Sequence, residues 1–332
     1  MTIKDTTPTH GASVAQRDEL AVERSREEQE LAGASVEVAS FGLTTPGGPT
    51  ARKRKAFVVY FAIGWLSVIV CAALLADFLP LRDPNGIPQT TEALEQHPFL
   101  QNVGVRADFL GTDDLGRSNL SRLVYGARVS LAIGLLSALG AMTFGLLIGI
   151  AGAFFGGAID WLVMLYINTM QAFPALVLLL ALAAILKPSV GTLSLMLAFL
   201  AIPTFARVTR ANALAVRNRD YVDAARALGA SRTRLIWREV FPVVFRAVLS
   251  YTFIVAAALI VAEASLSFLG LGIQPPNPSW GGMIANGQLK TSQDPKNFYL
   301  VLVPAIAFFF TVFSMNALGD WGRERMSRRT SL

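Results

Sequence analysis

The sequence predicts an all-α integral membrane protein with six transmembrane helices. Among its 332 residues, 53% are hydrophobic and only 16% are charged, and the mean hydropathy is +0.49. Soluble domains average about a quarter charged residues. The apolar residues also gather in blocks of the roughly 20 residues that a helix needs to cross a bilayer. These observations exclude an ordinary soluble domain and a large disordered protein.

The first part of the chain, residues 1–51, is polar, carries charges of both signs and shows no recurring apolar face. It has neither a basic start nor an early apolar run, so it does not resemble a signal peptide. Since such a composition cannot bury a core, we expect a disordered cytoplasmic tail. Four basic residues at 52–55 then precede the apolar stretch 56–76. Basic clusters stay in the cytoplasm, which predicts a first transmembrane helix whose N-terminus lies inside.

Residues 77–128 are polar and contain several prolines, which predicts a long external loop after the first span. Within this loop Leu115, Leu120, Leu123 and Val124 can share one face of a helix. Such a face favours an interfacial helix lying on the membrane, and the alternative is a plain N-terminal extension of the next span. The predicted organisation is a tail at 1–51, a first helix with its external loop at 52–123, and a transmembrane core at 124–325.

Five further apolar stretches complete the six predicted spans. They cover residues 129–155, 161–186, 191–206, 247–262 and 298–318. In the second span Gly145 with Gly149, and Gly152 with Gly156, have the small-xxx-small spacing that lets two helix backbones approach closely. Prolines inside several spans are tolerated because neighbouring helices satisfy the freed carbonyls.

The distribution of charge predicts the orientation of these spans. The segment 207–246 holds nine arginines against three acidic residues, and the C-terminal segment 319–332 holds four more arginines. The loops expected on the other side hold few basic residues or balance them with acids. Because basic residues stay on the cytoplasmic side, both termini and the 207–246 loop are expected to be cytoplasmic.

The most informative stretch is residues 220–242, whose pattern is typical of a helix, a turn and a second helix. Four small or apolar side chains fall on one face of the first helix: Tyr221, Ala224, Ala225 and Leu228. Gly229 follows, where helices commonly end, and Pro242 marks the entry to the next span. Two adjacent alanines give the helix a low ridge that suits insertion into a groove on a partner protein. The alternative is an ordinary loop helix resting on the membrane.

This stretch resembles the cytoplasmic loop of ABC-importer permease subunits, whose motif is Glu-Ala-Ala, three residues, Gly and an apolar-apolar-Pro ending. Ala224, Ala225 and Gly229 match the motif, and residues 240–242 match its ending. Asp223 stands where Glu is usual, and Phe241 stands where Leu is typical. The resemblance implies a loop that couples the chain to ATPase subunits, carried by Tyr221, Asp223, Ala224, Ala225, Leu228, Gly229 and Pro242.

Two further segments narrow the resemblance to the permeases of dipeptide, oligopeptide and nickel importers. One comprises residues 111–117 and 121–128 before the second span, and the other is 263–272 followed by a segment rich in proline at 274–281. Together the matches cover about residues 52–325. They imply a type I ABC-importer permease architecture in the inner membrane of a bacterium.

The resemblance also implies an assembly. The chain would form half of the translocation pathway for di- or oligopeptides together with a homologous second permease subunit. One or two ATP-binding ABC ATPase subunits and an extracytoplasmic solute-binding protein would complete the assembly, and the permease subunits would lie in the lipid bilayer. Nickel or another small solute is the alternative cargo. A stand-alone secondary transporter is the remote alternative, because it would need ionisable residues along the midplane and usually an internal repeat.

The sequence predicts no enzymatic activity, no cofactor and no metal site in the chain itself. None of the six lysines follows a glycine, so the phosphate-binding loop that ends in Gly-Lys-Ser/Thr is missing and ATP must be hydrolysed by a partner. His10 and His97 are the two histidines, and Cys71 is the single cysteine. This set argues against a catalytic triad, a His/Cys metal site and an intrachain disulfide. The arginines follow the inner membrane face, which argues against a nucleic-acid surface.

Three polar residues within the apolar segments are candidates for the translocation pathway or its gate. Glu263 is a carboxylate near the outer end of the fifth span, where it could reach water, and it serves either a gate or subunit contact or a structural role. Asn168 and Gln171 interrupt the third span. They either line the pathway or form hydrogen bonds with a neighbouring helix.

Overall fold

The computed structural model describes residues 49–87 and 110–330, which are almost entirely helical. The chain divides into two units, residues 1–56 and 57–332, and the packing below is that of the second. The tail predicted at 1–51 lies outside the described residues except for its last three positions, which begin a helix. The predicted division at 123 also falls inside a helix, because residues 119–155 are continuous.

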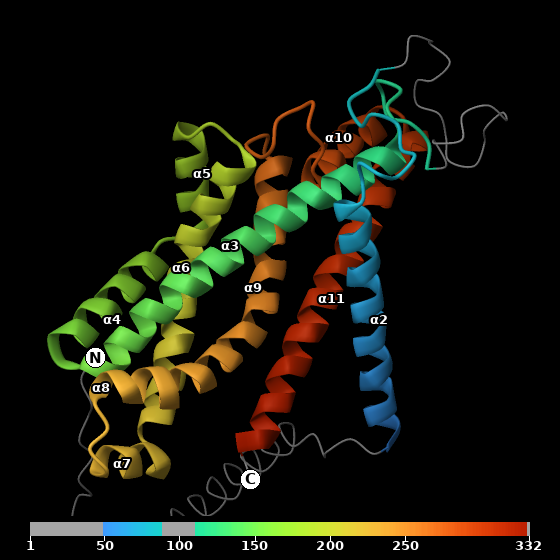
Figure 1. The fold of residues 1–332 in the computed structure, drawn as a ribbon. Coiled ribbons are helices and arrows are strands. Elements are labelled where there is room, and N and C mark those ends of the chain that lie inside the picture. Colours follow the sequence, from blue (N-terminus) through green and yellow to red (C-terminus); the bar gives the residue numbers. More distant parts are fainter. Residues whose placement is uncertain (1–48, 88–109, 331–332) are drawn as a thin grey trace, which may run out of the picture. The chain divides into compact units, whose positions relative to one another are not determined.

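From α3 onward the helices follow one another closely along the chain, apart from a longer connection between α9 and α10, and residues 75–118 separate α2 from α3 (Figure 1). They are α2 (Pro49–Leu74), α3 (Asn119–Phe155), α4 (Gly157–Ala172), α5 (Ala175–Ile185), α6 (Val190–Arg217), α7 (Asp220–Ala227), α8 (Arg232–Arg234), the π-helix η2 (Leu235–Val240), α9 (Phe241–Phe268), α10 (Trp280–Gln293), the 3₁₀-helix η3 (Pro295–Phe298) and α11 (Tyr299–Thr330). Five helical segments in the described part of the chain are long and apolar enough to cross a membrane, and α4 with α5 makes a sixth if that bent pair is one span.

The third predicted span, 161–186, is not one straight helix. It consists of α4 and α5, whose axes differ by 83°. The break lies at Phe173 and Pro174, where Phe173 adopts an extended conformation with φ −84° and ψ 136°. Proline disfavours helical geometry in the residue before it and lacks the N–H of a continuing helix, which accounts for the position of the break.

The structure differs from the sequence prediction in two parts of the external loops. Residues 119–128 form the first turns of α3, which begins after Ser118, whose hydroxyl accepts from the backbone N–H of Ser121. The separate interfacial helix was therefore the wrong interpretation, and the N-terminal extension was correct. The second part is α10, a helix that the sequence analysis did not predict and that follows a segment rich in proline. Its first turn is capped by Ser279, which accepts from the backbone N–H of Gly282 at 3.1 Å.

The glycines of α3 set the core packing, as their spacing predicts. A Cβ added at Gly145 would lie 2.4 Å from that of Phe205, and one at Gly149 would lie 2.6 Å from the carbonyl oxygen of Ala206. Both contacts are with α6, so these two glycines let α3 and α6 cross at short range. Gly152 faces α4 instead, and Gly156, with φ +63°, forms the turn between α3 and α4.

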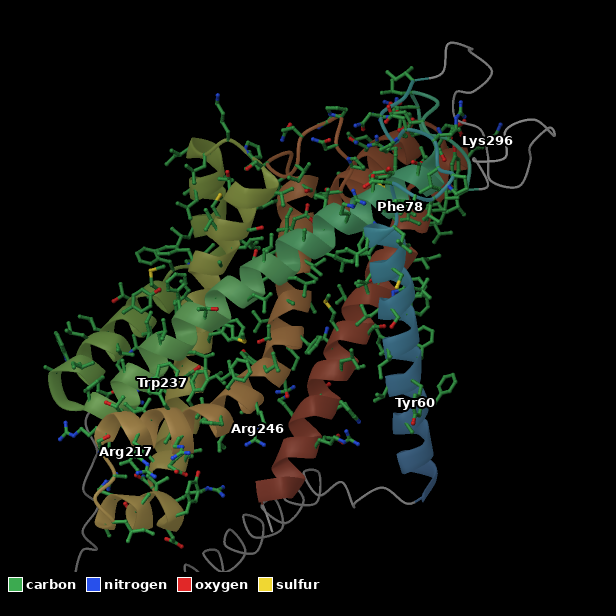
Figure 2. All side chains as sticks on the ribbon, viewed as in Figure 1. Tyr60, Phe78, Arg217, Trp237, Arg246 and Lys296 are labelled. Carbon is green, nitrogen blue, oxygen red and sulfur yellow. The ribbon has the colours of Figure 1, made fainter. Side chains whose placement is uncertain are left out.

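Helix α2 is the least buried of the five long apolar helical segments, with 11% of its apolar window buried. The indole Nε1–H of Trp65 donates to Thr311 Oγ1 of α11 at 3.0 Å, and Arg128 Nε of α3 donates to the carbonyl of Ala73 at 2.8 Å. Cys71 is exposed on this helix rather than packed inside. Tyr60 lies toward the same end of the bundle as Arg217, Trp237 and Arg246, and Phe78 lies toward the other end (Figure 2).

Candidate functional site

Helix α7 presents the predicted ridge to solvent. Val222 is its buried residue, with no exposed surface, whereas Tyr221 is 41% exposed and Leu228 is 88% exposed. Ala224 is exposed as well, and Ala225 is half-buried. Because Val222 anchors the helix from the opposite side, the ridge is available to a partner while the helix stays fixed to the bundle. Partial burial raises the pKa of the Tyr221 phenol.

The turn after α7 has the geometry that its glycine predicts. Gly229 has φ +83°, its N–H donates to the carbonyl of Arg226 at 3.0 Å, and the N–H of Ala230 donates to the carbonyl of Ala225 at 3.1 Å. These two bonds form a Schellman motif, which satisfies carbonyls that a helix end would leave free. A Cβ at Gly229 would meet no atom within 4 Å, so the backbone conformation alone requires glycine here.

The remaining residues of the predicted segment take two different places. Asp223 is exposed and forms an ion pair with Arg226 at 2.8 Å. Pro242 lies at the second position of α9, directly after η2 and within the helical run Arg232–Phe268. Between them η2 buries Leu235 and Val240 and exposes Trp237. The structure therefore places the ridge on α7 with Gly229 in the turn after it, and it places Pro242 where η2 passes into α9.

Glu263 is fully buried where α3, α9 and α10 meet, so it does not reach water within this chain. One carboxylate oxygen accepts from Ser267 Oγ at 2.8 Å and the other from Ser130 Oγ at 3.3 Å. Ser130 Oγ in turn accepts from the backbone N–H of Trp280 at 3.2 Å. Ser267 Oγ lies 3.4 Å from that of Ser279, the cap of α10. Hydroxyl chains thus connect this carboxylate to the first turn of α10.

Asn168 and Gln171 lie on the exposed surface of α4 and are not close partners of Glu263. Asn168 Oδ1 accepts from Arg207 Nη2 of α6 at 3.0 Å. Of the two predicted roles, Asn168 therefore makes the bond to a neighbouring helix. The side chain of Gln171 remains on the surface of this chain.

Comparison with known proteins assigns the chain to a family. Residues 141–331 match the model of the binding-protein-dependent transport system inner membrane component. The chain belongs to this family. It is a multi-pass transport permease of the bacterial inner membrane, and α7 and Gly229 lie within the matched region.

Individual relatives cover most of the chain. A Brucella suis protein assigned to the permeases of peptide transport systems is 36% identical over 285 residues, which is 84% of this chain and 91% of the relative. The dipeptide transport system permease protein DppC of Escherichia coli K12 is 36% identical, covering 83% of this chain and 89% of the relative. The di/tripeptide transport system permease protein DppC of Pseudomonas aeruginosa is 34% identical, covering 79% and 85%.

Two polar clusters of this membrane component were missed by sequence reasoning. At the end near α10, Asp113 Oδ2 pairs with Arg117 Nε at 2.7 Å and lies 3.5 Å from Arg122 Nε. At the end near α7, Asp160 of α4 pairs with Arg210 of α6. The arginines of α6 were interpreted in part as an orientation signal, and no partner was predicted for them. Their spacing of three and seven residues could have shown that they share one face of the helix.

Proposed function

We propose that the chain is the permease subunit of an ATP-driven ABC importer for di- and oligopeptides. The support is that relatives at 34% and 36% identity, over about four fifths of the chain, carry the names of dipeptide and di/tripeptide permeases. The chain would form half of the translocation pathway, and a homologous second permease subunit would form the other half. Nickel or another small solute is the alternative cargo.

The orientation of the chain is part of this proposal. The arginine-rich segment 207–246 and the end of α11 lie toward one end of the bundle, and α10 lies toward the other (Figure 1). The positive-inside rule assigns the first end to the cytoplasm. Both termini would then be cytoplasmic, and a solute-binding protein would deliver its cargo at the end near α10.

The exposed ridge of α7 is the observation that carries the coupling mechanism. A short helix fixed by Val222, with Tyr221, Ala224 and Leu228 turned outward, fits a groove on a folded partner. ABC ATPase subunits would bind there and hydrolyse ATP, because the chain has no phosphate-binding loop of its own. Closure of the ATPase subunits would move the docked segment, and the helices would reopen on the other side of the membrane.

The substitution Ala224→Trp tests the docking of this ridge. The indole projects into solvent in the isolated chain, so the permease should insert and assemble normally, but it overfills the partner groove. We expect loss of ATP hydrolysis stimulated by the binding protein and dipeptide, measured with the purified complex in proteoliposomes. Arg232→Ala, at another exposed position of the loop, is the control and should keep stimulation. Full stimulation with Ala224→Trp would contradict docking at α7.

The cargo is tested by uptake into proteoliposomes that hold the complete complex and its binding protein. We expect accumulation of a labelled dipeptide, dependent on ATP, and none of labelled Ni²⁺. Accumulation of Ni²⁺ alone would establish the alternative cargo. Uptake by the chain without ATPase subunits, driven by an ion gradient, would establish the secondary transporter and overturn the importer.

A further inference from the structure

Three arginines on one face of α6 reach the neighbouring helices. Arg207 donates to Asn168 Oδ1 at 3.0 Å, and Arg210 donates to both carboxylate oxygens of Asp160 at 2.5 and 2.6 Å. Arg217, in the last turn of α6, donates to the carbonyl of Ala153 at 2.6 Å. The first two bonds join α6 to α4, and the third joins it to the end of α3.

The pair of Asp160 and Arg210 is the strongest of these contacts. It is bidentate, and the side chains are only 27% and 23% exposed, so solvent screens it less than a surface pair. Asp160 lies in the first turn of α4, where the helix dipole favours a carboxylate. A Cβ at Gly152 of α3 would lie 3.2 Å from Asp160 Oδ1, so the glycine leaves room for this carboxylate.

The ion pair lies between the proposed coupling helix α7 and the bent pair of helices α4 and α5. Only two residues separate the end of α6 from the start of α7. A displacement of α7 therefore reaches α6 directly. Across the ion pair it reaches α4, which leads through the 83° break into α5. Packing alone holds α6 against α4 less specifically, because apolar side chains can slide past one another, whereas a bidentate pair fixes one register.

We propose that Asp160 and Arg210 are positioning residues that transmit movement of the coupling segment from α6 to α4 and α5. The proposal rests on the proposed function, because it presupposes that ATPase subunits move α7. Ionic partners within a membrane protein also serve simply to neutralise a costly charge. Transmission of movement and simple neutralisation of charge predict different coupling when both charges are removed together.

The test is a double-mutant cycle with Asp160→Asn, Arg210→Gln and the combination of both. The complete complex is reconstituted with its binding protein, and uptake of a labelled dipeptide and ATP hydrolysis are measured in the same vesicles. The readout is the number of dipeptides imported per ATP hydrolysed, which does not depend on how much complex assembles. Asp320→Asn removes an exposed ion pair, 2.5 Å long, from α11 and is the control.

We expect each single variant to lower the number of dipeptides per ATP by about fivefold, a size typical of mutations that modulate coupling between distant sites. The double variant should be as uncoupled as the singles, because neither partner transmits without the other. Asp320→Asn should match the wild type. Wild-type coupling in either single variant would overturn the proposal. Recovery in the double variant would also overturn it, since the pair would then only neutralise charge.

Failure of this proposal is distinguishable from failure of the proposed function. Loss of docking at α7, as in Ala224→Trp, removes stimulated ATP hydrolysis itself. Loss of transmission at Asp160 leaves ATP hydrolysis running and lowers the dipeptide imported for each ATP. If Ala224→Trp keeps stimulation, the coupling role of α7 fails whatever the cycle at Asp160 shows.

Discussion

At the scale of single residues, the proposed coupling site on α7 depends on one backbone conformation in the turn after it. Gly229 reverses the chain after α7 at φ +83°, and its Schellman bonds fix where the ridge ends. Since open space surrounds the position, a substitution there acts through backbone strain before it acts through any clash within the chain.

We predict that Gly229→Val abolishes stimulated ATP hydrolysis and uptake while membrane abundance changes little. A β-branched residue at positive φ costs about 1–3 kcal/mol, which favours unwinding of the turn. Gly229→Asn is the matched control, because asparagine tolerates this conformation, and it should retain more stimulation than valine. The measurement compares the stimulated ATP hydrolysis of the two purified variant complexes. Equal loss with both variants would show that side-chain bulk in the docked groove, rather than strain, matters at this position.

Residue types and their spacing predicted the helix and the turn of this segment. The alternation of Tyr221, Ala224 and Leu228 with a glycine after them was sufficient to locate an amphipathic helix and its end. The exposure of the ridge was not predictable from spacing, because a run of small and apolar residues is equally typical of a buried face. Val222 decides the matter, since it takes the buried side of α7.

At the scale of helices, α10 is held to the bundle by a polar network rather than by apolar packing alone. Ser267 lies at the centre of this network, between Glu263 of the same helix and Ser279 at the start of α10. Because Glu263 is fully buried, each of its carboxylate oxygens needs a donor from the protein.

Removing the Ser267 hydroxyl should weaken the attachment of α10. Ser267→Ala leaves a buried carboxylate oxygen without its 2.8 Å donor, at an expected cost of about 1–3 kcal/mol. The midpoint temperature of the purified complex should fall accordingly. Ser265→Ala is the control, because the Ser265 hydroxyl donates to the Val261 carbonyl of its own helix. A midpoint that falls equally in both variants would show that the network adds nothing specific.

The helix boundaries show where sequence reasoning succeeds and where it stops. Hydropathy located the five long apolar helices and the α4–α5 pair found in the described residues, because an apolar run of this length is unfavourable in water and suits the bilayer core. It joined α4 and α5 into one span, since composition does not report direction and only the geometry at Phe173 and Pro174 reveals the 83° bend. It also missed α10, which has fewer apolar residues than a span.

At the scale of the whole molecule, the proposed topology predicts which surfaces face each side of the membrane. With Cys71 replaced by serine as background, a thiol at Asn286 should react with an impermeant maleimide added to intact cells. A thiol at Ser231 should react only after the membrane is opened. Both positions are exposed in this chain, so accessibility within the fold does not bias the result. Labelling of Ser231 in intact cells would contradict six spans with cytoplasmic termini.

The N-terminal tail supplies a second prediction at this scale. Residues 1–45 have low apolar content and no helical periodicity, so we predict that they are dispensable for transport. Deleting them should leave dipeptide uptake near the wild-type rate at equal abundance in the membrane. A collapse of uptake at normal abundance would reveal a docking or regulatory role for the tail.

The sequence by itself determined the class of this protein: helices that span a membrane, an arginine-rich loop and a coupling motif with its glycine. These features depend on local composition and spacing, which act over one or two helical turns. The tertiary structure decided which polar residues meet. Glu263 is joined to Ser130 from a helix 133 positions earlier, and Arg210 is joined to Asp160 across 50 positions. Such contacts depend on how helices cross, and helix crossing is set by the shape of glycine-lined surfaces that no single segment contains.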